Sequence, residues 1–207
     1  MKASAVILAA GAGTRLGGVA KALLTGKDQC TFLARIVTHA RELGVEEPIV
    51  VVGPPHGDEV AAHARELGAL VVVNPRPARG MASSVALGFG ALCGLASAWT
   101  AAPSEKAPAG EIAAAWLWPV DHPEVAPATL RALIAALAQH EAARPTYEGR
   151  GGHPPLIARS LFARLAACAD AEGGARSVLA AADTIDVPVS DRGCVRDVDT
   201  PADLETV

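Results

Sequence analysis

Five side chains in this sequence have the chemistry needed to act on a phosphate group: Arg15, Lys21, Asp121, His153 and Asp199. Arg15 and Lys21 are fixed cations in a glycine-rich stretch, where they can hold phosphate oxygens together with backbone N–H groups. Asp121 and Asp199 are carboxylates of the kind that bind Mg²⁺, which commonly bridges a protein and the phosphates of a nucleotide. His153 could be a general base, a hydrogen-bond partner of a substrate or a solvated loop residue. These residue types indicate metal-assisted chemistry on a phosphate.

The stretch that carries the two cations begins as a strand and ends as a loop. Residues 6–8 are apolar, as expected of a strand buried on both faces, and the glycines that follow let the backbone turn and present its N–H groups. These glycines are Gly11, Gly13, Gly17 and Gly18. An ordinary βα turn with solvated cations is the alternative. The joint presence of the strand, the glycines, Arg15 and Lys21 argues against it.

Two better-known phosphate motifs are excluded by spacing. A P-loop needs Gly-Lys-Ser/Thr, and no such tripeptide follows the glycines at the required spacing. A dinucleotide fingerprint needs a third glycine where Leu16 stands, and an acidic residue after the next apolar run, which instead ends in Gly53-Pro54-Pro55. A nicotinamide-dependent enzyme is therefore not expected.

Both candidate metal ligands have a structural alternative. Asp121 ends an apolar run just before Pro123 and could simply form a turn, although the end of a parallel strand is also where ligands bind. Asp199 opens the sequence Asp-Thr-Pro, which is a good helix start. The metal site is therefore expected at Asp121 and Asp199, with Asp197 as a possible substitute for Asp199.

Strands and helices alternate along the chain, which predicts an α/β fold with a parallel sheet covered by helices on both faces. Apolar runs predict strands over 6–8, 48–52, 70–73, 112–120, 156–157 and 185–189. Helical spacing predicts helices over 31–43, 58–67, 80–95, 127–137, 160–168 and 175–182, and a helical turn after residue 201. The strands at 6–8 and 112–120 are thus expected to position the glycine loop and Asp121.

Composition limits the kind of protein. The 207 residues are 51% hydrophobic and 19% charged, which predicts one domain over 1–207 with an Ala/Pro-rich loop insertion at 97–110. A net charge of −4 and a pI near 5.8 give no sign of a nucleic-acid-binding surface. The apolar runs are too short to span a membrane and no signal peptide is predicted, so a cytoplasmic protein is expected. The four well-separated cysteines predict neither disulfides nor a zinc site.

A set of motifs extends over nearly the whole chain. They are Leu8-Ala9-Ala10-Gly11-Ala12-Gly13 with Arg15 and Lys21, then Asn74, Gly80-Met81 and Ser84, then Asp121 with Pro123, then Gly152-His153-Pro154, and finally Asp197-Val198-Asp199-Thr200-Pro201. With these motifs the chain resembles the MobA-like NTP transferase family. It looks most like the molybdenum cofactor cytidylyltransferases within it, because Ala-Ala-Gly opens the loop and Gly-His-Pro is present.

The resemblance implies a fold and a reaction. The fold would be a three-layer α/β/α Rossmann-like sandwich with a mostly parallel sheet, like that of the nucleotide-diphospho-sugar transferases. The reaction would be Mg²⁺-dependent transfer of CMP from CTP to the phosphate of molybdopterin, with release of pyrophosphate. A molybdoenzyme or its chaperone could receive the product. Such a transfer needs positioning and charge neutralisation rather than a protein nucleophile.

The resemblance also implies roles for individual residues. Catalysis would depend on Arg15, Lys21 and Asp121, and the metal would bind Asp121 and Asp199. The nucleotide would contact Leu8, Ala9, Ala10, Gly11, Ala12, Gly13, Arg15, Lys21, Asn74 and Gly80. The acceptor would contact Ser84, His122, Gly152 and His153.

Two features depart from the family pattern. His122 stands between Asp121 and Pro123 where the family usually has Gln, which bears on the choice of acceptor. The connection at 97–110 is also longer than the pattern needs. Two rival functions stay open: a related nucleotidyltransferase that uses GTP or another acceptor such as a sugar phosphate, and a non-catalytic nucleotide-binding factor that delivers the cofactor. The presence of Lys21 beside a candidate metal ligand argues against the second.

Overall fold

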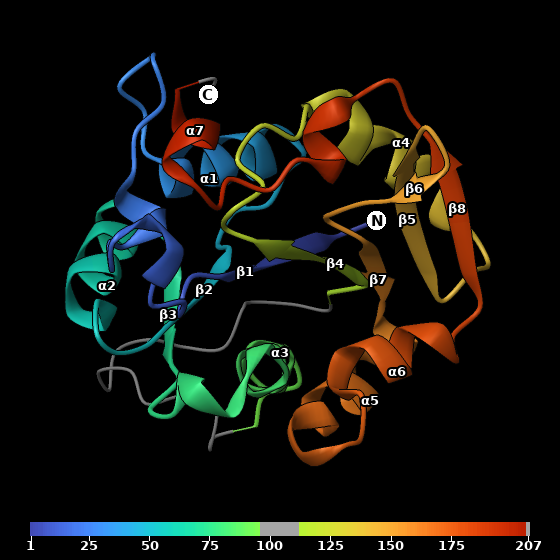
Figure 1. Cartoon of the computed structure of the whole chain (residues 1–207). Helices are drawn as coiled ribbons and strands as arrows, with labels where there is room; N and C mark the ends of the chain where they lie inside the picture. The colour runs from blue at the N-terminus through green and yellow to red at the C-terminus, as the bar shows by residue number, and fades with distance from the viewer. Residues whose placement is uncertain (96–111, 206–207) are drawn as a thin grey trace.

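The computed structural model describes residues 1–95 and 112–205, so the predicted insertion at 97–110 lies outside the described part of the chain (Figure 1). The strands are β1 (Ala3–Leu8), β2 (Ile49–Val52), β3 (Leu70–Val73), β4 (Ala114–Pro119), β5 (Ala142–Tyr147), β6 (Arg150–Gly151), β7 (Leu156–Ala158) and β8 (Thr184–Pro188). The helices are α1 (Phe32–Glu42), α2 (Gly57–Glu66), α3 (Met81–Leu92), α4 (Pro127–Leu137), α5 (Phe162–Ala166), α6 (Gly174–Ala180) and α7 (Pro201–Leu204). Within these residues no helix has the length and apolar character needed to cross a membrane.

The described strands form a mixed sheet in the order β3-β2-β1-β4-β7-β5-β6, with β8 paired to β5. The four strands β3, β2, β1 and β4 run parallel to one another. β7 is antiparallel to both β4 and β5, and β8 is again parallel to β5. The predicted mostly parallel sheet is confirmed, and its antiparallel pairs are confined to the C-terminal half.

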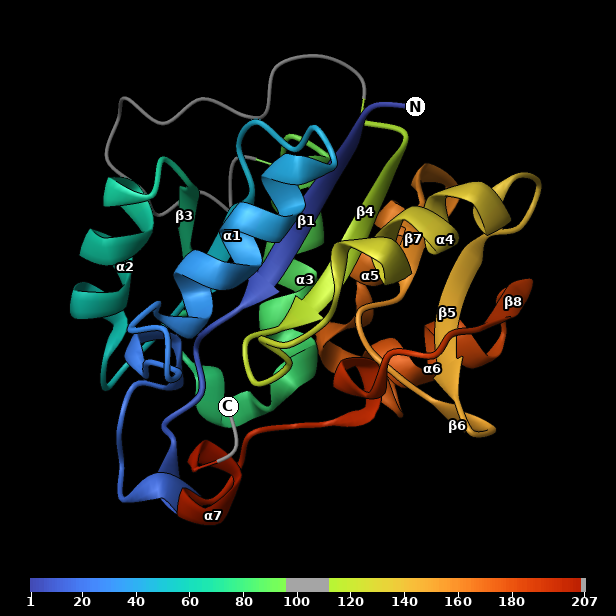
Figure 2. The ribbon, with the colours of Figure 1, turned by 90° about the horizontal axis from the view of Figure 1, so that it is seen from above.

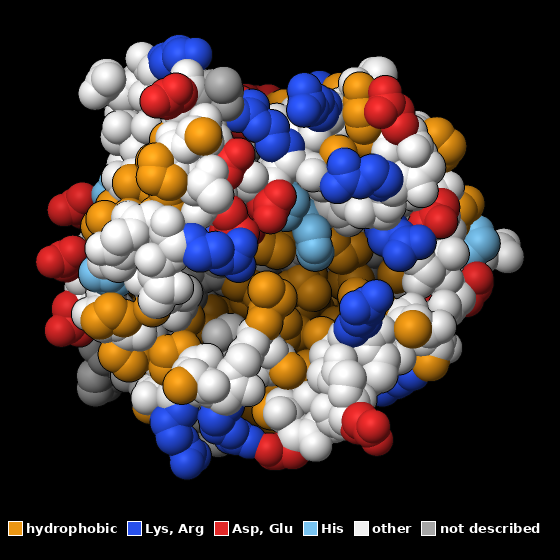
Figure 3. Space-filling view, viewed as in Figure 1, with side chains coloured by type: hydrophobic (Ala, Val, Ile, Leu, Met, Phe, Trp, Pro, Cys, Tyr) orange, Lys and Arg blue, Asp and Glu red, His pale blue; other side chains and the backbone are white. Residues whose placement is uncertain are grey.

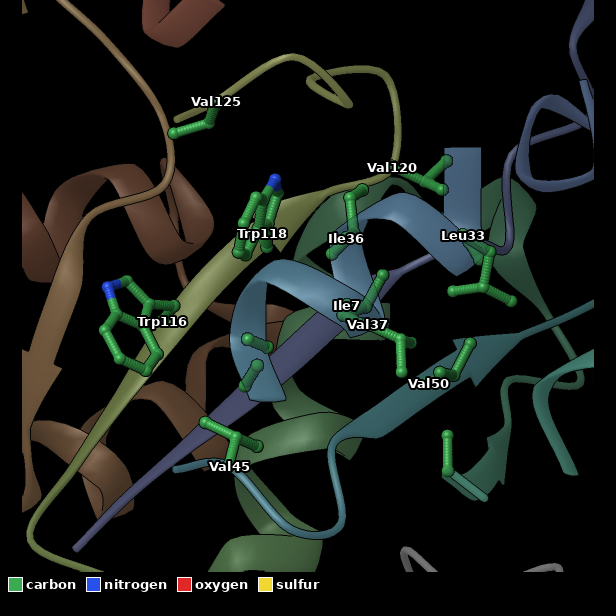
Figure 4. Close-up of a cluster of buried hydrophobic side chains, with 14 of the residues drawn as sticks. Ile7, Leu33, Ile36, Val37, Val45, Val50, Trp116, Trp118, Val120 and Val125 are labelled. Atoms are coloured by element: carbon green, nitrogen blue, oxygen red, sulfur yellow. The ribbon is translucent and has the colours of Figure 1, made fainter. Parts of the chain in front are cut away.

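Alternating side chains of the central strands fill two separate cores. Ile7 of β1 belongs to the core under α1, α2 and α4, whereas its neighbour Val6 belongs to the core under α3 and α5. Trp116 and Trp118 of β4 are fully buried on the first side, where Figure 4 shows Trp118 next to Ile36 of α1 and Trp116 further along the strand. Strands that are apolar on both faces require a helical layer on each. The predicted three-layer α/β/α sandwich is therefore confirmed.

The strands β5 and β6 are absent from the sequence-based prediction. β5 reads Ala-Ala-Arg-Pro-Thr-Tyr, which lacks an apolar run, and its Pro145 has no N–H to contribute to a ladder. The strand forms because Ala142 and Ala143 pair with β7 on one side while β8 runs beside it on the other. The Gly152 N–H also donates to the Pro145 carbonyl at 2.8 Å. Partners distant in sequence thus make this strand.

The register between β1 and β4 aligns their carboxyl ends. Leu8 lies opposite Pro119, and the Val120 N–H donates to the Leu8 carbonyl at 3.2 Å. The glycine loop and Asp121 therefore leave the sheet next to each other. Figure 2 shows α7 and the loop after β1 together at the end toward which β1 and β4 point. Three segments far apart in sequence meet at the edge where parallel sheets bind ligands.

Candidate active site

The loop after β1 is tight because of Gly13. This residue has φ +59°, and a Cβ there would lie 1.9 Å from the Val19 carbonyl oxygen, so no larger side chain fits. The Gly18 N–H donates back to the Gly13 carbonyl and closes the turn. The loop leaves Arg15 on its outer side, with 72% of the side chain exposed. It then leads to Lys21, which starts a short 3₁₀ segment.

Arg15, Lys21, Asp121 and Asp199 form a charge cluster at the carboxyl edge of the sheet. The Lys21 ammonium group donates to Asp121 Oδ2 at 3.3 Å and also to Asp199 Oδ1. Arg15 Nη1 donates to the other oxygen of Asp199. The side chains of Lys21 and Asp199 are only 15% and 14% exposed, so water screens their interaction less than it screens a surface pair. Two cations and two anions leave the cluster neutral.

The two carboxylates of the charge cluster use their oxygens differently. Burial raises the pKa of Asp199, but the hydrogen bond and charge of Lys21, together with the charge of Arg15, outweigh burial and hold that pKa below its ordinary value. Asp121 gives one oxygen to Lys21. Its other oxygen, Oδ1, is buried and has no hydrogen-bond partner in the described part of the chain. A buried acceptor without a donor is costly, and a cation beside it would remove that cost.

The donors at this edge suit a cation that arrives with a nucleotide. In residues 1–95 and 112–205, no three His, Cys, Asp or Glu side chains are grouped closely enough to hold a metal ion by themselves. Mg²⁺ usually keeps several waters and binds one or two carboxylates plus substrate phosphates. Asp121 and Asp199 fit that requirement. Asp197, the possible substitute, is exposed, and it is Asp199 whose carboxylate contacts Lys21.

The C-terminal segment is tied to the charge cluster by its backbone. The Val198 N–H donates to the Asp121 carbonyl at 2.8 Å. The Asp203 carboxylate accepts from the N–H groups of Asp199 at 3.2 Å and Thr200 at 2.8 Å. Thr200 and Asp203 thereby form the capping box that starts α7. The same contacts that begin α7 also hold the Asp199 backbone beside Asp121.

A cavity of about 200 Å³ lies beside the charge cluster, between the loop after β1 and the start of α3. Figure 3 shows a hollow with a hydrophobic floor near the centre of the face, with acidic, basic and His side chains gathered along one side. The cavity is lined by Leu8, Ala9, Ala10, Gly11, Lys21, Ala22, Pro77, Gly80, Met81, Ser84, Pro119, Val120 and Asp121. An apolar cavity with charges at one end suits a ligand that has a ring and phosphates.

The predicted nucleotide residues divide into two groups. Most of them line the cavity: Leu8, Ala9, Ala10, Gly11, Lys21 and Gly80. Ala12, Gly13 and Arg15 lie further along the loop and are not part of its lining. Gly13 shapes that loop, and Arg15 reaches the site through Asp199.

Asn74, predicted to bind the nucleotide, is buried behind the cavity instead of lining it. Its Nδ2 donates to the Ser83 and Ser84 hydroxyls at 2.8 and 2.9 Å, and its Oδ1 accepts the Arg76 N–H at 3.0 Å. Ser84, predicted to bind the acceptor, lines the same cavity as the nucleotide residues. Because its oxygen already accepts from Asn74, the Ser84 hydroxyl hydrogen is left to donate to a ligand.

His122 and His153 form a histidine pair on the far side of Asp121 from the glycine loop. Their ring centroids are 4.8 Å apart and tilted by 41°, and the Nδ1 atom of each is buried without a hydrogen-bond partner among the described residues. Burial lowers the pKa of His122, although the Asp121 charge acts in the opposite direction. Burial and the neighbouring His122 ring lower the pKa of His153 to about 4. Both rings are therefore neutral at pH 7.

Gly152, also predicted for the acceptor, shapes the backbone beside the histidine pair. A Cβ at Gly152 would lie 2.4 Å from the Cys194 carbonyl oxygen, and that same oxygen accepts the His153 N–H at 2.7 Å. The segment after β6 can therefore approach the C-terminal segment only because residue 152 has no side chain. Of the predicted acceptor residues, His122, Gly152 and His153 lie together, and Ser84 lies apart with the cavity.

Several residues of the site were not assigned a role from the sequence, Met81 and Asp203 among them. Met81 lines the cavity and is 62% exposed, and a large apolar residue directly after Gly80 at a helix start was the available signal. Asp203 holds the Asp199 and Thr200 backbone. Its signal was the spacing of a Thr three residues before an Asp, which is typical of a capping box.

Comparison with known proteins relates the chain to a wider group. A family model described as the MobA-like NTP transferase domain matches residues 5–185, and no curated protein sequence matches the chain. The crystal structure of Rv0371c from Mycobacterium tuberculosis H37Rv has a TM-score of 0.74 and 29% identity, covering 100% of this chain and 96% of that one. A Rv0371c complex with manganese has a TM-score of 0.69 and 27% identity, with 100% of both chains covered. A nucleotidyl transferase from Methanothermobacter thermautotroptrophicus, 21% identical with a TM-score of 0.69 over 99% of this chain and 95% of that one, shares the fold.

Proposed function

Because the chain belongs to the family of MobA-like NTP transferase domains, we propose that it transfers CMP from CTP to the phosphate of molybdopterin in a reaction that requires a divalent cation. The observation that carries this proposal is the charge cluster beside the cavity, where Lys21 contacts the carboxylates of both Asp121 and Asp199. Cations and metal-binding carboxylates at one end of an apolar cavity are what phosphoryl chemistry on a nucleotide needs.

The proposed reaction forms one bond and breaks another at the α-phosphorus. A phosphate oxygen of the acceptor attacks, the bond from the α-phosphorus to the bridging oxygen breaks, and pyrophosphate leaves with the electron pair. The attacking oxygen is already anionic at neutral pH, so no protein nucleophile is required. A bound Mg²⁺ supplies charge neutralisation and alignment of the phosphates. The complex of Rv0371c with manganese supports the use of a divalent cation by this protein.

The residues of the charge cluster would exchange partners when the substrate binds. Asp199 now neutralises both Arg15 and Lys21. Phosphate oxygens of the nucleotide would replace Asp199 as the partners of these cations, and Asp199 would turn to the divalent cation together with Asp121. Lys21, the less exposed of the two cations, would lie beside the α-phosphoryl group, where charge increases in the transition state. Arg15 would hold the outer phosphates.

The base would lie in the cavity. The Ser84 hydroxyl, oriented by Asn74, would donate to a carbonyl oxygen of the base. The Ala10 methyl group lines the cavity, and it takes up space that a glycine would leave free. A pyrimidine needs less of that space than a purine, which supports CTP over GTP as the donor.

The acceptor would lie on the other side of Asp121, beside the histidine pair. His122 and His153 are neutral at pH 7 because burial lowers the pKa of each. A neutral imidazole ring can donate one hydrogen bond and accept another. It carries no charge, so it neither strongly attracts nor repels the charged acceptor substrate. His153 would orient the acceptor phosphate toward the α-phosphorus, with the His122 ring packed against it, while the charge cluster neutralises the reacting groups.

The donor assignment is tested by pyrophosphate release with molybdopterin and each of CTP, GTP, ATP and UTP. We expect CTP to give the highest kcat/KM, and Ala10→Gly to raise the GTP to CTP ratio about tenfold by opening space for a purine. Leu8, which also lines the cavity, offers the matched Leu8→Ile control. Turnover with GTP but not with CTP would contradict the cytidylyltransferase assignment.

The acceptor assignment is tested with CTP held constant and the acceptor varied. Molybdopterin, glucose 1-phosphate and inorganic phosphate are compared at equal concentration, again by pyrophosphate release. We expect pyrophosphate release with molybdopterin but not with the other two acceptors. Turnover with glucose 1-phosphate but not with molybdopterin would contradict the acceptor assignment and indicate a sugar-phosphate nucleotidyltransferase.

A further inference from the structure

One pair of atoms beside the charge cluster is placed for a shared ligand. The Asp121 Oδ1 atom is buried and has no hydrogen-bond partner in the described part of the chain. Its neighbour is His122 Nε2, at 4.0 Å. This separation is too long for a hydrogen bond, whose heavy atoms lie at about 2.7–3.2 Å. The two atoms therefore face each other without bonding.

The separation of 4.0 Å falls within the range expected for two ligands of one metal ion. A divalent cation binds imidazole nitrogen and carboxylate oxygen at about 2.1 Å each, so two such ligands lie about 3.0 Å apart at right angles and about 4.2 Å apart on opposite sides. We propose that Asp121 Oδ1 and His122 Nε2 bind the same divalent cation, and that this nitrogen ligand makes the site prefer a transition-metal ion such as Mn²⁺ over Mg²⁺. This inference rests on the metal-binding role proposed above for Asp121.

The protein holds both ligands in place before any cation arrives. Trp118 Nε1–H donates to the His122 carbonyl at 2.9 Å, and the His122 N–H donates to the Pro119 carbonyl at 3.2 Å. The His122 ring packs on His153 at 4.8 Å between centroids. The other Asp121 oxygen is occupied by Lys21. Asp121 Oδ1 thus remains without a partner among the described residues, and Nε2 is the His122 ring nitrogen that lies near it.

The nitrogen changes which cation binds best. Mg²⁺ demands oxygen ligands and gains little from imidazole, whereas imidazole binds first-row transition metals well. Replacing His122 by Gln keeps a polar side chain and offers an amide oxygen in place of the nitrogen. The substitution should therefore weaken transition-metal binding and leave Mg²⁺ binding nearly unchanged.

The direct test is electron paramagnetic resonance of Mn²⁺ bound to the full chain, with and without CTP. We expect ¹⁴N modulation from a directly bound imidazole in the wild type, replaced by ¹⁵N modulation when the protein is made with ¹⁵N-histidine. His122→Gln should abolish that modulation and lower Mn²⁺ affinity about tenfold, with Mg²⁺ affinity, measured by competition, changed less than about twofold. His153→Gln is the matched control and should retain the modulation.

Bound Mn²⁺ without nitrogen modulation in the wild type, or modulation that survives in His122→Gln, would overturn the inference. The isotope comparison needs no substitution, so it holds even if a variant folds poorly. Asp121→Asn separates this inference from the proposed function. If Asp121→Asn abolishes Mn²⁺ binding while His122→Gln has no effect, the metal role of Asp121 stands and the nitrogen ligand is rejected. If Asp121→Asn leaves Mn²⁺ binding unchanged, both fail.

Discussion

Asp121 lies between the other residues of the charge cluster and the histidine pair. The two regions differ in whether their polar atoms already have hydrogen-bond partners. In the charge cluster, Lys21 and Asp199 satisfy each other, and Arg15 adds a second contact. In the histidine pair, both Nδ1 atoms are buried and unbonded within the described residues. The first region would have to break existing pairs when substrate binds, whereas the Nδ1 atoms of the second have no partner among the described residues to give up. We infer that charge is kept for the reacting phosphates and neutral polarity for the acceptor.

Replacing Lys21 tests the first half of this comparison most severely. Lys21→Ala should lower kcat about 10³-fold, because a preorganised charge at the α-phosphoryl group acts mainly in the transition state. The Kd for CTP, measured by calorimetry, should change less than about tenfold. Lys21→Arg keeps a positive charge and should restore part of the turnover. Equal losses in kcat and in CTP binding would mean that Lys21 only anchors the nucleotide.

Replacing Asp199 should have opposite effects on binding and turnover. Asp199→Asn removes a metal ligand, so kcat should fall about 10²-fold. The substitution also removes the negative charge that now pairs with Arg15 and Lys21. The phosphates of CTP then no longer compete with the Asp199 carboxylate for these cations, so CTP binding measured in EDTA should become roughly threefold tighter. Asp186→Asn, at an exposed carboxylate of β8 that pairs with Arg144 of β5, is the matched control and should change neither value by more than about twofold. Weaker CTP binding in EDTA would contradict the exchange of partners.

Burial of the histidine pair should make the free energy of unfolding depend on pH. The pKa of His153 is about 4 in the folded protein, below its ordinary value of 6.5, so the unfolded chain binds a proton that the folded chain does not. Stability is then full above pH 6.5 and falls as the pH drops from 6.5 toward 4, by about 2 kcal/mol between pH 7 and pH 5 from this residue.

Urea unfolding in EDTA at pH 7 and pH 5 measures this effect. His153→Asn should reduce the loss of unfolding free energy on acidification by about 2 kcal/mol relative to the wild type. The same substitution at His140, which contacts Asp183, controls for a general effect of removing a histidine. An unchanged pH dependence in His153→Asn would show that the ring is not kept neutral by its surroundings.

The sequence predicts the β1 end of the site better than the C-terminal end for a physical reason. The glycine loop and Lys21 lie within a short stretch whose apolar run and glycines specify a strand and a turn locally. Asp199 comes to Lys21 through contacts between residues far apart in sequence, such as Arg196 with Glu124 and the Val198 N–H with the Asp121 carbonyl. The local pattern favoured Asp199 with Asp197 as a substitute, and the long-range contacts bring the Asp199 carboxylate to Lys21.

The two halves of the sheet show the same division. The buried strands β1, β2, β3 and β4 consist of continuous apolar runs, so both their presence and the α/β fold are predicted correctly. β5 contains Pro145 and an exposed Arg144, and it exists only through pairing with β7 and β8. The tilted contact between the His122 and His153 rings likewise depends on that half of the sheet. The sequence predicts each histidine as a candidate acceptor-binding residue, but it does not predict that the two rings contact each other.

The most direct test of the proposed function is to follow the α-phosphate of CTP. The protein is incubated with α-³²P-labelled CTP, molybdopterin and Mg²⁺ or Mn²⁺, and the products are separated. We expect the label on molybdopterin in an amount equal to the pyrophosphate released, and no label transfer by Asp121→Asn of unchanged fold. Label that stays in CTP or appears as free CMP, or transfer that survives in Asp121→Asn, would contradict the account.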